Sequence, residues 1–331
     1  MGLVRKNQFV GSLIGQCLGD ALGFVKEGAS TIVCERYVED VLRPKKINKI
    51  KWGQYSDDSQ LTRELLLSYV SKGMFDQADY ARRIMLIFHR ARVVGGGFAT
   101  SRSAHRMAKG IPIDEAGEPP PYAGNGTAMR AAPIGLIFYD TPDKLVKASD
   151  DQSRITHKDK RCSAGAIAIA GAVAQALLSD PIDADKFCVK LSNLTHGYDP
   201  VLENALAKDM CDWIKLQPLD ALTKISIVGL RNDFSNQRWE GISPFVTPSV
   251  LWSLYSFLRT PEDYWKSICT AIWSGGDVDT TAAMTGAISG TRVGIEGIPN
   301  DWARHITDCG EWDYDDLVKL AEECYETRSK Q

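Results

Sequence analysis

Two short acidic segments, far apart in the sequence, carry the residues best suited to chemistry. They are YSDDSQLT at residues 55–62 and SGGDVDTT at residues 274–281, and each places a hydroxyl group beside two carboxylates. These six residues are Ser56, Asp57, Asp58, Asp277, Asp279 and Thr280. Each segment also precedes an apolar helical pattern. Taken singly, the first segment is explained by helix capping and by acids at the positive end of the helix dipole, and Gly-Gly-Asp in the second could equally form an Asx-type turn.

Taken together, the two segments predict a metal site. Four carboxylates and two hydroxyls form a ligand set of oxygen atoms alone, which suits Mg²⁺ or Mn²⁺ better than zinc. Four buried carboxylates would repel one another strongly without cations. We therefore expect the segments to meet in the fold and hold two Mg²⁺ ions, with Mn²⁺ as a substitute. Such a pair can orient a substrate and activate a water molecule.

Two other kinds of site share part of this pattern. Asp277-Val-Asp279-Thr-Thr281 matches the D-x-D-x-T motif of haloacid-dehalogenase phosphatases, but that motif follows a buried strand near the N-terminus. Here Gly275-Gly276 precedes it, close to the C-terminus. An EF-hand loop also begins D-x-D, yet its glycine at the sixth position and glutamate at the twelfth are absent. Neither alternative fits.

Helical periodicity dominates the rest of the chain. Apolar residues recur at helical spacing, and no segment shows convincing alternation or a glycine-containing hairpin. The expected helices cover residues 9–18, 61–69, 84–88, 128–137, 162–178, 184–194, 201–214, 249–258, 262–272, 280–292 and 314–325. Glycines inside the first and central helices indicate close helix packing, since each costs about 1 kcal/mol relative to alanine. We predict an all-α, compact multi-helix globule with a single domain over residues 1–331.

Composition excludes several classes of partner. The formal net charge is −3, and the only basic run, residues 43–51, is interpreted as a solvated loop. No strong nucleic-acid signal is therefore present. None of the eight cysteines forms a C-x-x-C pair, which favours free thiols and a reducing compartment. The apolar run 164–178 is too short to span a bilayer and is interpreted as a buried helix. We expect a cytoplasmic protein without a membrane partner.

Five segments, in order, resemble those of the ADP-ribosylglycohydrolase family, which includes dinitrogenase-reductase-activating glycohydrolases. The segments are GSLIGQCLGDALG at 11–23 followed by Glu27, the acidic segment at 55–62, GNGTAMRAAP at 124–133, Thr156-His157, and the acidic segment at 274–281 continuing to Pro299. Each motif is weak alone, whereas five in family order are specific. Some family members carry an additional aspartate in the segment aligned with residues 95–100, where this chain has no carboxylate.

The resemblance implies a single all-α domain with two Mg²⁺ ions in a cleft. It makes the six residues of the acidic segments the metal ligands, with Ser56 standing where the family often has threonine. Catalytic roles fall to Glu27, Asp57, Asp58 and Asp279, with Glu27 on a mobile loop as ligand, general base or general acid. The implied substrate contacts are Gly124, Asn125, Gly126, Thr127, Met129, His157 and Phe245, the last stacking on adenine. Asp20 and Arg130 are expected to hold helix ends and the loop.

The function implied is hydrolysis of the glycosidic bond between ADP-ribose and its acceptor, most simply an ADP-ribosylated protein. Two other functions stay open at this point. One is a catalytically silent ADP-ribose-binding module, and the other is a metal-dependent nucleotide phosphohydrolase. The sequence does not identify the acceptor, whose choice we expect to depend on loops 36–54 and 229–248.

Overall fold

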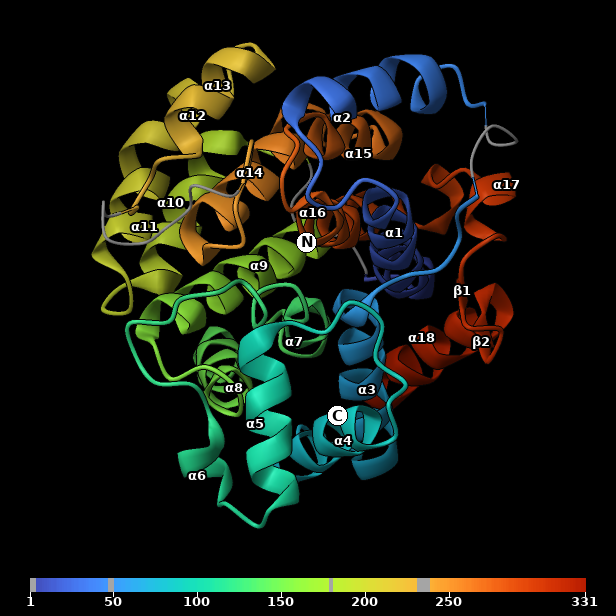
Figure 1. Cartoon of the computed structure of the whole chain (residues 1–331), viewed down its shortest axis with the longest axis vertical. Helices are drawn as coiled ribbons and strands as arrows, with labels where there is room; N and C mark the ends of the chain where they lie inside the picture. The colour runs from blue at the N-terminus through green and yellow to red at the C-terminus, as the bar shows by residue number, and fades with distance from the viewer. Residues whose placement is uncertain (1–3, 47–50, 179–180, 231–238) are drawn as a thin grey trace.

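The computed structural model of the chain describes residues 4–46, 51–178, 181–230 and 239–331 (Figure 1). The first half contains α1 (Lys6–Phe24), α2 (Thr31–Tyr37), the π-helix η1 (Val38–Leu42), α3 (Asp57–Lys72), α4 (Gln77–His89), α5 (Phe98–Ala108), α6 (Ile113–Ala116), α7 (Ala132–Ile137), α8 (Pro142–Arg154) and α9 (Lys160–Leu178). The second half contains α10 (Ala184–Thr195), α11 (Pro200–Asn204), the π-helix η3 (Ala205–Asp209), α12 (Met210–Trp213), α13 (Pro218–Ile225), α14 (Val246–Arg259), α15 (Tyr264–Trp273), α16 (Val278–Val293), the 3₁₀ turn η4 (Ile295–Gly297), α17 (Asn300–Ala303), β1 (Thr307–Asp308), β2 (Trp312–Asp313) and α18 (Tyr314–Ser329). The predicted all-α class is confirmed.

The two helices that begin at the acidic segments form for ordinary local reasons. Ser56 is the N-cap of α3, and its side chain accepts a hydrogen bond from the backbone N–H of Asp58. The same helix ends at Gly73, whose φ of 67° is a left-handed conformation that glycine adopts without strain. Asp277 occupies the N-cap position of α16 and Asp279 lies in its first turn, where the helix dipole favours negative charge.

The closest helix pair is α1 against α16, which lie side by side in the centre of the molecule (Figure 1). A Cβ atom added at Gly15 would lie 2.4 Å from the carbonyl oxygen of Gly286, and one added at Gly290 would lie 2.0 Å from that of Gly11. These glycines are therefore required by backbone contact, which explains their cost in helix propensity. The pair brings the end of α1, and so Glu27, to the start of α16.

The central helix α9 is buried, as the sequence indicated. It is long and apolar enough to cross a bilayer by composition alone, but 89% of its most apolar stretch is buried inside the protein. Its neighbours include α7, α8, α10, α14 and α16. The helix is therefore part of the core of a folded domain.

Three local expectations were wrong. The helix expected at 128–137 begins only at Ala132. The preceding residues form successive turns, in which the carbonyl oxygens of Asn125 and Ala128 accept backbone hydrogen bonds. The helix expected at 201–214 is divided into α11, η3 and α12, with a π-helical middle. The chain also contains a small antiparallel hairpin, β1 and β2, which was not expected. Two-residue strands are too short to show an alternating pattern.

Candidate metal and substrate site

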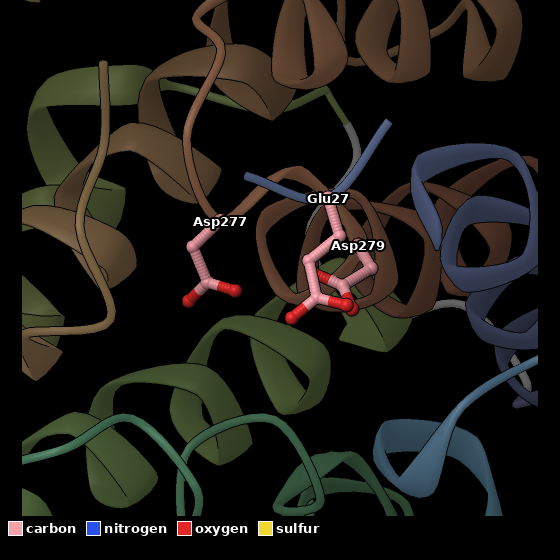
Figure 2. A group of neighbouring side chains, drawn as sticks. All are labelled: Glu27, Asp277 and Asp279. Atoms are coloured by element: carbon pink, nitrogen blue, oxygen red, sulfur yellow. The ribbon is translucent and has the colours of Figure 1, made fainter. Parts of the chain in front are cut away.

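The two acidic segments meet in the folded chain. Asp57 and Asp58 at the start of α3, and Asp277, Asp279 and Thr280 at the start of α16, line one cavity of about 220 Å³ together with Glu27. Carboxylate oxygens of Glu27, Asp277 and Asp279 all lie within 4.8 Å of one another, and their side chains point into the same space (Figure 2). The prediction that distant helix starts converge is confirmed by this geometry.

Neighbouring donors fix the orientation of the carboxylates but leave oxygen atoms available. The backbone N–H of Gly97 donates to Asp57 Oδ2 at 3.3 Å. The Ser56 hydroxyl donates to Asp58 Oδ2 at 3.0 Å, while Asp58 Oδ1 is buried and has no hydrogen-bond partner in the described part of the chain. A buried carboxylate oxygen without a partner is costly unless a cation or water molecule reaches it. This oxygen-only donor set suits a hard divalent cation.

The electrostatics of the cluster support the same conclusion. Burial, followed by repulsion from Asp20 and Asp57, holds the pKa of Asp58 well above its usual range. Burial, followed by repulsion from Asp277 and Asp58, does the same for the pKa of Asp279. Burial also raises the pKa of Asp57 to about 7. Carboxylates this crowded resist ionisation, so bound cations would lower the free energy of the ionised cluster.

Asp20 has the structural role expected from the sequence. It lies on α1, is fully buried, and accepts hydrogen bonds from the backbone N–H groups of Ser56 at 2.9 Å and Ser59 at 3.1 Å. The Ser59 hydroxyl donates to it at 2.6 Å. Asp20 therefore caps α3 from a different helix and fixes the position from which Asp57 and Asp58 project.

The Gly-Asn-Gly loop lies against the carboxylates, and the side chains of Asn125 and Thr127 have different surroundings. The Asn125 amide donates to Asp277 Oδ2 at 2.5 Å and to Ser249 Oγ at 2.8 Å, so it orients a carboxylate of the cluster. Thr127 is fully buried and donates its hydroxyl to the Cys162 carbonyl oxygen at 2.8 Å. Asn125 therefore positions a carboxylate and also lines the cavity, as do Gly124, Gly126 and Met129. Thr127, for which we also expected a substrate contact, is packed in the interior and does not line the cavity.

The surroundings of His157 favour a neutral ring and one tautomer. Arg130 Nη2 donates to Thr156 Oγ1 at 2.8 Å, and His157 Nδ1 lies 2.8 Å from the same oxygen, an arrangement that favours donation of the hydroxyl proton to Nδ1. The proton of the neutral imidazole is then on Nε2, the nitrogen that lies beside Gly124 in the cavity. Burial, followed by repulsion from Arg130, lowers the pKa of His157 to about 3. His157 therefore presents a neutral N–H donor to the cleft.

Phe245 lies outside the cleft. Its ring packs beneath the Arg161 guanidinium, 5.3 Å from the ring centre, and it lines a neighbouring cavity with Thr247. The sequence did not point to two aromatic residues that do line the cleft, Tyr122 and Phe98, whose ring centres are 5.7 Å apart. The only signal for Tyr122 was its place just before the Gly-Asn-Gly motif.

The segment with three consecutive glycines, residues 95–97, also borders the cleft. It carries no carboxylate, and it contributes the Gly97 N–H that holds Asp57. In the long loop 229–248, residues 231–238 lie outside the described residues, while Trp239 and Pro244 reach the cleft. The other segment expected to affect the acceptor, 36–54, is helical at residues 36–42, and none of its described residues lines the cleft. Its residues 47–50 lie outside the described part of the chain. In loop 229–248 the residue predicted to contact the substrate was Phe245, whereas Trp239 is the aromatic residue of this loop that lines the cleft.

Comparisons with known proteins agree with this architecture. The ADP-ribosylglycohydrolase family model matches residues 1–331. The chain is 28% identical to ADP-ribosylhydrolase ARH3 of Xenopus tropicalis, over 92% of this chain and 93% of that protein. It is 23% identical to the ADP-ribosyl-[dinitrogen reductase] glycohydrolase of Rhodospirillum rubrum, over 88% of each.

A solved structure described as an ADP-ribosylglycohydrolase-related protein complex has the same fold. It superposes with a TM-score of 0.74 and 22% identity, covering 98% of this chain and 99% of its own. Family membership supports hydrolysis of a glycosidic bond of ADP-ribose as the class of reaction. The family match over the whole chain, in agreement with the converging carboxylates and the fold, shows that this protein belongs to the ADP-ribosylglycohydrolase family.

Proposed function

We propose that this protein is a magnesium-dependent enzyme that hydrolyses the glycosidic bond between ADP-ribose and an acceptor, releasing ADP-ribose. The observation that carries the proposal is the convergence of five carboxylates, from three separate parts of the chain, beside a glycine loop and a neutral histidine donor. The carboxylates belong to Glu27, Asp57, Asp58, Asp277 and Asp279. Such a set is costly to bury and has no evident structural use.

The metal ligands in this proposal are the carboxylates at the starts of α3 and α16, with Thr280 and Ser56 as hydroxyl donors. Thr280 lines the cavity, whereas Ser56 does not line it and donates its hydroxyl to Asp58. When bound, two Mg²⁺ ions would supply positive charge that orients ribose hydroxyls and acidifies a water molecule. Mn²⁺ suits the same oxygen ligands.

The diphosphate of ADP-ribose fits the Gly-Asn-Gly side of the cavity. Among the described residues, no partner is present for the backbone N–H of Gly126, and His157 directs Nε2–H into the same space. A Cβ atom at Gly126 would lie 3.0 Å from His157 Cε1, so glycine leaves room for a phosphate oxygen there. The cavity volume of about 220 Å³ is too small for the whole ligand. Its adenosine end would therefore extend along the open mouth, past Tyr122 and Phe98.

Glu27 is the best-placed group for proton transfer. It is the exposed member of the acidic cluster, while Asp277 and Asp279 are buried. Burial, followed by repulsion from Asp277 and Asp20, raises the pKa of Glu27, which brings it closer to neutral pH. Departure of the acceptor leaves positive charge on the ribose, and the surrounding carboxylates stabilise that charge. Glu27 can take the proton of the attacking water because it reaches both the cluster and the solvent.

A panel of defined ADP-ribosyl linkages tests the proposal. Wild-type protein with Mg²⁺ should release ADP-ribose from at least one linkage, chelation should abolish release, and added Mg²⁺ should restore it. Asp277→Ala should remain folded and lose activity by a factor on the order of 10³ or more. Asp212→Ala, which removes an aspartate that is 82% exposed, is the matched control and should retain full activity.

Three results would contradict the proposal. They are undiminished hydrolysis after exhaustive chelation, release of AMP or inorganic phosphate instead of ADP-ribose, and binding of ADP-ribose without turnover of any linkage. The panel also distinguishes N-glycosidic from O-glycosidic acceptors. We further propose that the protein works in a reducing compartment such as the cytoplasm, since all eight cysteines are free thiols and seven are at least partly buried.

A further inference from the structure

A second cavity, of about 590 Å³, lies between α3, α4, residues 90–94 and the hairpin turn around Cys309. Residues 93 and 94 line this cavity, and residues 95 and 97 line the acidic cleft, so one short segment separates the two. Five arginines contribute to its wall: Arg63, Arg82, Arg83, Arg90 and Arg92. This arginine cavity, as we call it below, has no part in the proposed hydrolysis.

The floor of the arginine cavity holds a guanidinium in a defined position. Arg63 is 4% exposed, pairs with Asp308 at 2.6 Å and with Glu64 at 3.2 Å, and lies over the Trp312 ring, 4.9 Å from its centre. Its Nε atom is buried and has no hydrogen-bond partner among the described residues. A guanidinium that is stacked and paired in this way keeps a fixed orientation, and planar guanidinium groups in fixed positions are the preferred protein ligands for phosphate.

The mouth of the arginine cavity holds cations whose present partners are easily exchanged. Arg92 pairs with Glu311, but both side chains are more than half exposed, and exposed ion pairs contribute little free energy. Arg82 is 55% exposed and shares Asp79 with Arg83. Within the described part of the chain, Arg90 has no ion pair at all.

The carboxylates facing these arginines are fewer. Glu64, Asp308 and Glu311 line the cavity, and Asp79 lies behind its wall. Arg63 and Arg83 both use Glu64, so one carboxylate serves two guanidinium groups. The cavity therefore retains an excess of donors that an anion can accept. We propose that the arginine cavity is a second binding site, for a ligand that carries a phosphate group.

The wall shared with the acidic cleft links the two sites physically. Gln60, one turn into α3, donates to the carbonyl oxygen of Arg92 at 3.0 Å and accepts from the backbone N–H of Val94 at 3.0 Å. The Val94 carbonyl oxygen then accepts from the backbone N–H of Asp57 at 2.8 Å. A ligand that pulls on Arg92 therefore acts on the segment that holds Asp57.

Cys309 provides a local reporter of occupancy. It is the exposed cysteine among the eight, and it lines the arginine cavity. The rate of its alkylation by iodoacetamide is measured by mass spectrometry on the intact protein with Mg²⁺ present. Inorganic phosphate and AMP are the two probes, with chloride at equal ionic strength as the reference. We expect millimolar phosphate to slow alkylation of Cys309 at least threefold relative to chloride, because charge-assisted hydrogen bonds hold the anion beside it.

The comparison of probes identifies the ligand class. Equal protection by both probes means that the phosphate group alone is recognised, and protection at lower AMP concentrations means that a nucleotide is the ligand. No protection by either probe overturns the proposal. Protection that disappears when excess ADP-ribose is added also overturns it, because the anion would then occupy the acidic cleft.

Charge reversal at the mouth tests the residues. Arg90→Glu with Arg92→Glu should weaken phosphate protection by a factor on the order of ten or more. The matched control is Arg36→Glu with Arg43→Glu on and after α2. This control makes the same change in net charge. Like the test pair, it combines one arginine without a described ion pair, Arg36, and one in an exposed ion pair, Arg43 with Glu39.

The control should leave protection unchanged, and equal protection in both doubly substituted proteins would refute the assignment. Arg90→Gln with Arg92→Gln repeats the test if charge reversal impairs folding. Because the readout is alkylation of Cys309, its outcome is independent of whether the enzyme proposed above turns over any substrate.

Discussion

Replacement of Gly23 by alanine should damage the acidic site through the backbone, without removing any polar group. Gly23 lies in the last turn of α1, four residues before Glu27. A Cβ atom at this position would lie 2.4 Å from the carbonyl oxygen of Val278 and 2.5 Å from the Cα atom of Asp279. Both neighbours are backbone atoms at the start of α16, so no side chain can rotate to make room.

The size of the effect follows from the overlap. Non-bonded heavy atoms pack at about 3.5 Å, so the two helix ends must separate by about 1 Å. A misplacement of that size in a catalytic site costs on the order of 100-fold in rate. Overpacking should also lower the free energy of unfolding by about 1–3 kcal/mol, offset by about 1 kcal/mol from the better helix propensity of alanine.

Gly11→Ala is the matched control. Its Cβ atom would lie 2.3 Å from the carbonyl oxygen of Gly290, the same kind of clash in the same helix pair. The position is twelve residues from Gly23 in one helix, about 18 Å along the axis. Both variants should therefore lose similar stability in thermal unfolding, while only Gly23→Ala should lose turnover and Mg²⁺ affinity. Full activity in Gly23→Ala, or equal loss of activity in both variants, would refute the reasoning.

Three further predictions concern single side chains. Because the folded-state pKa of Asp279 is raised, the metal-free wild-type protein should lose stability as the pH rises above about 4. Asp279→Asn should therefore unfold at a higher temperature than wild type at pH 8. A lower unfolding temperature for the variant would contradict repulsion among the carboxylates. In ¹⁵N NMR spectra His157 should stay neutral with its proton on Nε2 at pH 5. The exposed His196 should be charged at that pH, because the hydrogen bond that its ring donates to Glu203 raises its pKa. Protonation of both histidines together would contradict burial as the cause. Asn125→Ala should weaken Mg²⁺ binding about 10-fold or more in calorimetry, since it removes a charge-assisted hydrogen bond to Asp277; unchanged affinity would exclude the positioning role.

The sequence by itself determined the type of fold and the residue types that gather in the acidic cleft. The acidic residues, their adjacent hydroxyls and the absence of thiols or imidazoles at both segments predicted a set of oxygen donors before any contact was known. Helical periodicity gave the all-α class, and Gly11, Gly15 and Gly19 indicated the close packing that the structure shows. Asp20 was assigned correctly to helix ends. Each of these features depends on residue types and their spacing within one segment, which can be read directly from the sequence.

Only the tertiary structure decided which groups surround the carboxylates. The Asn125 amide donates to Asp277, Phe245 packs outside the cleft, and Gly97 supplies a backbone donor to Asp57. Each depends on the path of an irregular loop, which has no periodicity to read. The tautomer of His157 likewise depends on Arg130, a residue on another segment. A hydrogen bond between distant loops is set by where packed helices place the loop ends, and that placement is a property of the whole chain.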